Sequence, residues 1–307
     1  MEKKINKDKN NPIKQHHVPK VYLKNFCEQK GQLAVLNKQT GKIFSASIDS
    51  VGFEKNFYTL SKLEDPYCWE KIYARGIEPL MGVLLPKIIS KASILVRDGA
   101  SIIDVREKFL LAYIMIMQLL RGKQMRAHGE ELYKKLLPFI LDKAIEKFEP
   151  LNAHSLELLD EFESDPYYYK QVIMKVALDS ERLNRYVHIL GNHIFIFLHL
   201  YGETDFVTSD NPVMFINSKT ADSKPFSNGL LQKTTCVYYP LAANLLLWIV
   251  HPDMYFQSDL SMDRSLFHLN KDKEQRFISF INQKQFEQCH SQVYASEQGT
   301  LEKLEKR

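Results

Sequence analysis

Five polar side chains, drawn from three separate segments, could bind or cleave a phosphate ester: His17, Gln118, Arg121, Ser209 and Asp210. An imidazole that titrates near neutral pH can act as a general acid or base, and a carboxylate can act as a base or hold a metal ion. A guanidinium one helical turn from an amide can clamp a phosphate. We therefore predict that His17 and Asp210 are catalytic, and that Gln118, Arg121 and Ser209 bind the substrate.

Each of these residues also has a structural interpretation. His17 lies just before a predicted helix start, where its ring could simply bond the backbone. Ser209, Asp210 and Asn211 precede a proline and can form a turn that bonds its own backbone. A buried Arg121 needs a partner, and a carboxylate of the same fold serves as well as a phosphate. The sequence leaves both interpretations open.

Other site patterns are absent. The chain has no phosphate-binding G-x-x-x-x-G-K-[ST] loop, no G-x-G-x-x-G, no H-E-x-x-H and no G-x-S-x-G. His188, His193 and His199 are spaced five and six residues apart, which does not align them on one helical face as metal ligands. The triplet 28–30 has the Glu-x-Lys form of a two-metal nuclease strand, but it falls in a predicted loop. The sequence identifies no cofactor, and it leaves a divalent metal ion as an open alternative.

The composition is that of an ordinary globular protein, with 45% hydrophobic and 25% charged residues among 307. The longest apolar runs, such as 244–250, are far shorter than the roughly 20 residues that span a bilayer, so we expect core strands and no membrane partner. The N-terminus lacks the apolar segment of a secretory signal, which favours a cytoplasmic location. The four scattered cysteines indicate reduced thiols.

Positive charge is concentrated at the N-terminus. Residues 1–24 hold seven lysines and two acidic residues, a net charge of +5, whereas the whole chain carries +4. Such a segment is either a solvated terminus or an arm that contacts phosphates.

The order of the predicted elements favours an α+β fold. Residues 32–36 and 42–48 form a β-hairpin, and 65–200 form a mostly helical middle with a capping box at Asp104 and Glu107. Residues 203–251 are rich in strands and predict a small antiparallel sheet, and 271–294 predict a closing helix. We expect one domain over 15–298, between a flexible basic tail at 1–14 and a charged tail at 299–307.

Six short motifs occur in a characteristic order: His17-x-Pro19-x-x-Tyr22-Leu23-x-x-Phe26, Asn37-Lys38-x-Thr40-Gly41-Lys42, Phe57-Tyr58, Gln118-x-x-Arg121, Thr208-Ser209-Asp210-Asn211-Pro212 and Pro240-Leu241. Together they resemble the bacterial family catalogued as domain of unknown function 4238. The resemblance implies no activity, cofactor or substrate, but it marks the same polar positions as the chemistry does. In that family we expect a proline between the residues that match Arg121 and Arg126, which this chain lacks.

Three hypotheses follow. The first is an intracellular bacterial hydrolase of phosphodiesters or nucleotides, a nuclease-like effector in stress or phage defence, with nucleic acid or a nucleotide as its partner. The second is a non-catalytic protein that binds nucleic acid or a partner through the lysine tail and the Arg121 region. The third is a purely structural network that joins the hairpin to the helical core.

Overall fold

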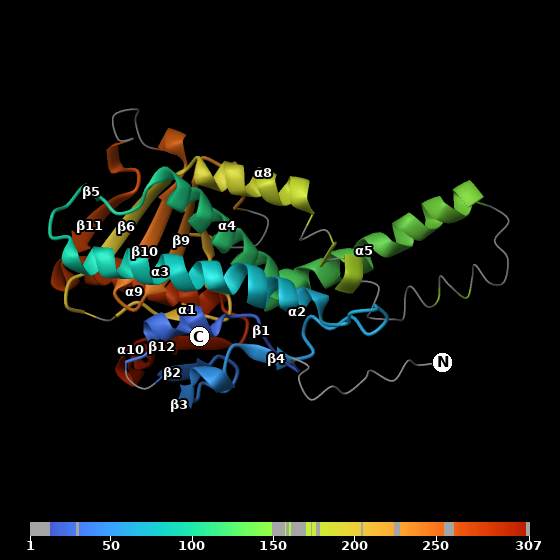
Figure 1. Cartoon of the computed structure of the whole chain (residues 1–307), viewed down its shortest axis with the longest axis horizontal. Helices are drawn as coiled ribbons and strands as arrows, with labels where there is room; N and C mark the ends of the chain where they lie inside the picture. The colour runs from blue at the N-terminus through green and yellow to red at the C-terminus, as the bar shows by residue number, and fades with distance from the viewer. Residues whose placement is uncertain are drawn as a thin grey trace.

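The computed structural model describes residues 13–28, 31–148, 157, 160, 170–172, 174–175, 179–203, 205–223, 228–254 and 261–304. Within these residues, helices pack on both faces of a six-stranded sheet, and a four-stranded sheet lies beside it (Figure 1). The arrangement of N-terminal strands, helical middle, C-terminal sheet and closing helix confirms the predicted α+β class.

The six-stranded sheet has the order β5-β11-β6-β10-β9-β8. Neighbouring strands are antiparallel except β11 and β6, so the predicted small antiparallel sheet is in fact larger and mixed. Its strands are β5 (Ala100–Ser101), β6 (Ile194–Leu200), β8 (Met214–Asn217), β9 (Thr235–Ala242), β10 (Leu245–Val250) and β11 (Ser265–Leu269).

Both faces of this sheet are buried. Phe195 and Phe197 of β6 pack into the core that α3 (Glu78–Ile94) and α4 (Val105–Arg121) cover. Ile194 and Ile196 point the other way, into the core under α9 (Lys271–Gln288). The helical region predicted over 65–200 extends too far, because its last residues form β6. The burial of β6 on both faces explains this error. Every residue of β6 is buried, and a continuously apolar run shows neither the helical nor the strand period.

The helical middle begins with α2 (Cys68–Ile72), which continues through a π-helical turn (Tyr73–Ile77) into α3. The predicted capping box starts α4, since Asp104 accepts from the N–H of Glu107 and the Glu107 side chain accepts from the N–H of Asp104. Helix α5 (Lys123–Phe148) follows directly and projects from the body of the molecule, and α8 (Ser180–Gly191) packs beside α4 (Figure 1). None of the described helices combines the length and apolar composition that crossing a bilayer requires.

The four-stranded sheet joins the two ends of the chain in the order β3-β2-β12-β7. The predicted hairpin is confirmed as β2 (Gln32–Asn37) and β3 (Ile43–Ser47), which pair in antiparallel register around a turn with Gly41 at a positive φ of 67°. β12 (Gln292–Ala295) lies between β2 and β7 (Thr208–Ser209). The predicted closing helix therefore ends earlier than expected, at Gln288, because 292–295 form a strand.

Parts of both predicted tails belong to the fold. Lys14 belongs to β1 (Lys14–His16), which pairs with β4 (Phe53–Lys55), and residues 1–12 lie outside the described part of the chain. At the other end, α10 (Gln298–Glu302) packs on the four-stranded sheet, with Leu301 fully buried. Apolar contacts thus hold residues 299–304 in the fold, where a charged tail was predicted.

Candidate functional site

The last turn of α4 holds the segment that contains the two adjacent histidines. Gln118 donates from Nε2 to the carbonyl of His17 at 3.0 Å, and Arg121 donates from Nη2 to the carbonyl of His16. This segment then enters α1 (Lys20–Leu23), whose Tyr22 stacks on Tyr239 of β9. The structure therefore places His17 next to Gln118 and Arg121, which follow it in the sequence by about a hundred residues.

Arg121 is buried and has several partners. Its Nη2 lies 3.1 Å from Oε1 of Glu78, its Nε lies 3.4 Å from the hydroxyl of Tyr58, and its guanidinium lies 4.5 Å from the ring centre of Tyr73. The structural ion pair considered from the sequence is thus present. However, Nη1 of Arg121 is buried and has no hydrogen-bond partner among the described residues.

The imidazole of His17 is only 2% exposed, and neither ring nitrogen has a partner among the described residues. The ring packs against Phe57, with ring centres 5.6 Å apart. Burial lowers the pKa of His17 well below its usual value, and the nearby charges of Lys123 and Arg121 act in the same direction. At neutral pH the ring is therefore neutral and is not bonded to the backbone as its structural interpretation required.

Asp210 has a fully used carboxylate. It accepts from the N–H groups of His290, Ser291 and Gln292 at 2.8, 2.7 and 3.1 Å, and from the Ser291 hydroxyl at 2.6 Å. The side chain is 1% exposed. Its partners lie in the turn between α9 and β12, whereas the structural interpretation placed them in its own turn. Asp210 thus fixes this turn against β7.

The hydroxyl of Ser209 also accepts hydrogen bonds from groups of the fold. Its hydroxyl accepts from the N–H of Asn211 at 3.0 Å and from Nε2 of Gln285 on α9. We call Ser209, Asp210, Gln285 and Ser291 the Asp210 cluster. We call His17, Gln118 and Arg121, together with Tyr58, Glu70, Tyr73 and Glu78, the Arg121 cluster.

The two clusters are neighbours without merging. Asn211, next to Asp210, donates from Nδ2 to Oε1 of Gln124 at the start of α5, and the charge of His290 acts on His17. Still, no direct hydrogen bond joins Asp210 to His17 or Arg121 among the bonds of the described residues. The five predicted site residues therefore fall into two groups.

A cavity of about 30 Å³ borders the Arg121 cluster. Arg126 lines it, with its guanidinium 4.3 Å from the ring centre of Phe57 and its Nη1 bonded to the Phe57 carbonyl. No described carboxylate lies within ion-pair distance of Arg126. The residues around the cavity are aromatic, basic or apolar: Phe57, Tyr58, Tyr73, Leu120, Arg121, Gly122, Arg126, Lys170 and Met174. The guanidinium groups of Arg121 and Arg126 give this lining positive charge, which suits an anionic group.

Sequence reasoning missed Glu70 and Tyr73, which join the Arg121 cluster from α2 and the π-helical turn. Glu70 is 8% exposed, and its Oε2 is buried without a described partner. Burial raises its pKa to about 7, although Arg121 opposes the shift. The one available signal was spacing, because Glu70 and Tyr73 are three residues apart and so share a helical face.

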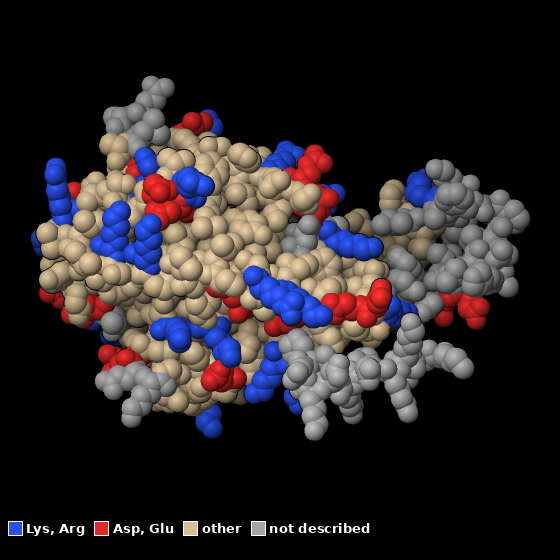
Figure 2. Space-filling view, viewed as in Figure 1, with Lys and Arg blue, Asp and Glu red and all other residues tan. Residues whose placement is uncertain are grey.

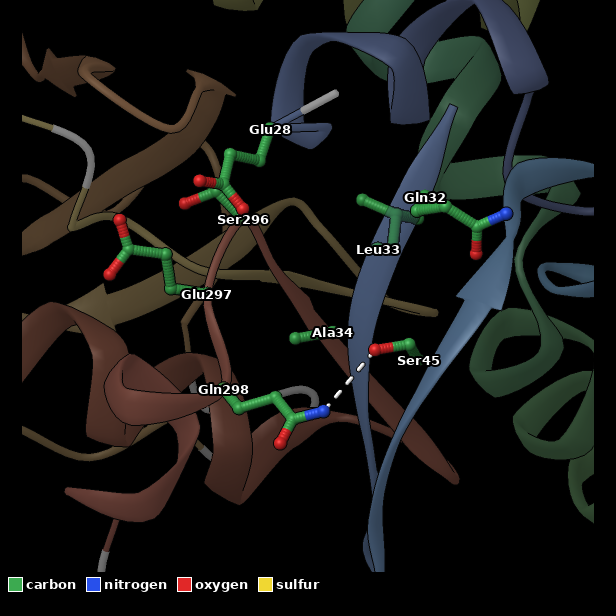
Figure 3. Close-up of a pocket in the computed structure, with 8 residues that line it drawn as sticks. All are labelled: Glu28, Gln32, Leu33, Ala34, Ser45, Ser296, Glu297 and Gln298. Atoms are coloured by element: carbon green, nitrogen blue, oxygen red, sulfur yellow. Dashed lines mark hydrogen bonds between the residues drawn. The ribbon is translucent and has the colours of Figure 1, made fainter. Parts of the chain in front are cut away.

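A larger cavity of about 610 Å³ lies elsewhere, between β2 and the end of β12 (Figure 3). Glu28, the first residue of the Glu-x-Lys triplet 28–30, lines this cavity, but none of the five predicted site residues does. In the described part of the chain, no group of three or more His, Cys, Asp or Glu side chains could hold a metal ion.

Comparison with known proteins identifies the family but no activity. No curated protein and no solved structure matches the chain. A family model described as "Protein of unknown function (DUF4238)" matches residues 14–299, nearly the whole chain. The resemblance drawn from the six motifs is thereby confirmed, and the chain belongs to the DUF4238 family.

Proposed function

We propose that this protein binds a phosphate-bearing ligand, a nucleotide or the terminus of a nucleic acid, at the cavity beside Arg121. The observation that carries the proposal is the buried Nη1 of Arg121, which has no described partner in a cluster where its other nitrogens are bonded. A buried donor without a partner costs about 1–3 kcal/mol, which a bound phosphate oxygen would recover. Arg126 on the same cavity adds positive charge.

The size and surroundings of the cavity favour a single phosphate group over a duplex. A volume of about 30 Å³ holds one or two water-sized groups, so an oxygen of a terminal phosphate can enter it and a duplex cannot. On the face shown in Figure 2, basic and acidic side chains are interspersed, so that face offers no continuous positive track. A duplex needs many phosphate contacts, whereas a terminal phosphate needs one well-built pocket.

Binding is favoured over hydrolysis by His17 and Asp210 because neither side chain is available for proton transfer. Asp210 already accepts four hydrogen bonds, and His17 is 2% exposed with a lowered pKa. A general base must reach the proton that it removes.

Hydrolysis remains a second candidate because of Glu70. A buried carboxyl with a pKa of about 7 beside a guanidinium can both donate and accept a proton near neutral pH. If the protein is a hydrolase, the phosphate ligand is its substrate. Arg121 then polarises the phosphate, and Glu70 accepts a proton from the attacking water.

The test compares binding of AMP, ATP and a 5′-phosphorylated oligonucleotide by calorimetry. In Arg126→Met we expect affinity to fall about tenfold to a hundredfold, because a charge-assisted bond contributes about 1.5–3 kcal/mol. Arg106→Met, which removes an exposed arginine at the opposite end of α4, is the matched control and should bind as the wild type does. Unchanged affinity in Arg126→Met would contradict the proposal.

The same samples distinguish binding from hydrolysis. Chromatography of the incubated nucleotides should show no product if the protein only binds. Product that forms with the wild type and disappears in a folded Glu70→Gln variant would support the hydrolase.

A further inference from the structure

The larger cavity arises because two paired strands end at different levels. β12 stops at Ala295, which pairs with Ala34 of β2. β2 extends further, so Gln32 and Leu33 have partners on β3 but none on β12. Beyond Ala295 the chain turns away into α10, and the space of about 610 Å³ opens between the two (Figure 3).

The register shows which main-chain groups face this space. Asn37 donates to Lys42 and Gly31 accepts from Ile48, so odd-numbered residues of this stretch bond toward β3. Lys38 donates to Ser291, so even-numbered residues bond toward β12. The N–H and C=O of Gln32 therefore point to the side where β12 has ended. A strand end of this kind is a template for an added strand.

The side chains around the cavity include two carboxylates and so give it negative charge. Glu28 and Glu297 lie on the same wall as Ser296, opposite Gln32 and Leu33 at the end of β2 (Figure 3). No basic side chain lines the cavity, and neither carboxylate has an ion-pair partner among the described residues, although the charge of Lys271 acts on Glu297 from outside the cavity. At the other end, Gln298 donates to Ser45 at 3.2 Å and closes the space (Figure 3).

From these features we infer that the cavity binds a short extended peptide segment of a partner protein, paired with the main chain of Gln32 and carrying a lysine or arginine that contacts Glu28 and Glu297. The volume lies within the range of about 300–1,000 Å³ that is usual for ligand pockets, and it suits a few residues. The main-chain bonds provide affinity, and the two carboxylates provide selectivity. This site is separate from the cavity at Arg121, so it does not depend on the proposed phosphate ligand.

The first experiment tests charge. The probe is a fluorescein-labelled five-residue peptide of alternating lysine and valine, and its binding is followed by anisotropy. The double variant Glu28→Gln with Glu297→Gln should weaken binding by about threefold to thirtyfold, because exposed ion pairs are individually weak. Glu130→Gln with Glu131→Gln makes the same change of charge on α5 and should leave the affinity unchanged. Equal binding by the wild type and the first double variant would overturn the inference, as would no binding to the wild type.

The second experiment tests strand pairing. One peptide is N-methylated on its valine amides and another on its lysine amides. In an added strand only one of these two sets faces β2, so exactly one of the peptides should lose binding. If both bind like the parent, or if spermidine binds as tightly as the peptide, charge alone explains the affinity and the peptide site is excluded. Urea unfolding of each variant shows whether its fold is intact.

Discussion

Asp210 and Arg121 are equally buried, yet the clusters around them differ in how completely their polar atoms are bonded. Asp210 and Arg121 are each 1% exposed. The carboxylate of Asp210 has four donors around it, and one buried atom of its cluster, Oε1 of Gln285, has no described partner. The Arg121 cluster contains five such atoms: Nη1 of Arg121, Oε1 of Gln118, Oε2 of Glu70 and both ring nitrogens of His17.

This difference separates two roles for buried polar residues. A fully bonded group contributes to stability and has nothing left to offer a ligand. A group with spare donors or acceptors keeps a cost of desolvation that a ligand can remove. The Asp210 cluster is therefore expected to serve stability, and the Arg121 cluster is the better place to look for binding.

The largest expected effect is the loss of stability in Asp210→Asn. The amide nitrogen of Asn would face N–H donors that now bond a carboxylate oxygen, so the turn between α9 and β12 would lose bonds to a charged acceptor. We expect the free energy of unfolding to fall by about 3–5 kcal/mol. Urea unfolding followed by circular dichroism measures the change.

Asp49→Asn is the control for this prediction. Asp49 is exposed, and among the described residues its carboxylate pairs with Lys20 alone, at 3.0 Å, so we expect a loss of less than about 1 kcal/mol. If the two variants were equally stable, the bonds around Asp210 would not be structural, and its assignment to catalysis would deserve a new test.

A smaller effect is expected from Glu70→Gln, and it depends on pH. The pKa of Glu70 is raised to about 7 by burial, so the folded protein binds this proton more tightly than the unfolded chain does. The contribution of this carboxyl to the free energy of unfolding is therefore fully present below its ordinary pKa of about 4.5, and it is lost as the pH rises through 7. Gln mimics the protonated form at every pH.

We therefore expect Glu70→Gln to be more stable than the wild type at pH 8, by at most about 3 kcal/mol, and to match it near pH 4.5. Urea unfolding of both proteins at the two pH values measures this difference. Glu64→Gln, at an exposed position nearby in the sequence, should show no such trend. A Glu70→Gln variant that is less stable at pH 8 would mean that the carboxylate is ionised and paired with Arg121 in the folded protein.

Local features of the sequence predicted the fold correctly where a single hydrophobic periodicity or a single capping or turn motif determines an element. The capping box of α4 and the hairpin around Gly41 are both as expected, because each depends on neighbouring residues. β6 was missed because burial on both faces erases its alternation. The pairing of β12 with β2 joins residues that are more than 250 positions apart, and no local pattern specifies it.

The candidate site was predictable as a set of residues but not as a geometry. His17, Gln118 and Arg121 were selected for their chemistry, and the fold brings them together. Their bonding decides their role, and bonding depends on distant partners such as the turn 290–292 for Asp210. Glu70 was missed because a single acidic residue on a helix resembles a solvated one until its burial is known.

The smallest effect on stability at neutral pH is expected from His17→Leu, and it tests whether an unbonded buried ring matters. The ring nitrogens of His17 make no described hydrogen bond, so an apolar side chain of similar volume should change the free energy of unfolding at pH 7 by less than about 1 kcal/mol. At pH 5 the variant should be more stable than the wild type by about 1–2 kcal/mol, because a buried His with a lowered pKa loses stability as the pH falls below about 6.5. Urea unfolding at both pH values measures the two differences, and His188→Leu, at an exposed position on α8, is the control. A loss of several kcal/mol at pH 7 would show that His17 is bonded in solution, as the carboxylate of Asp210 is.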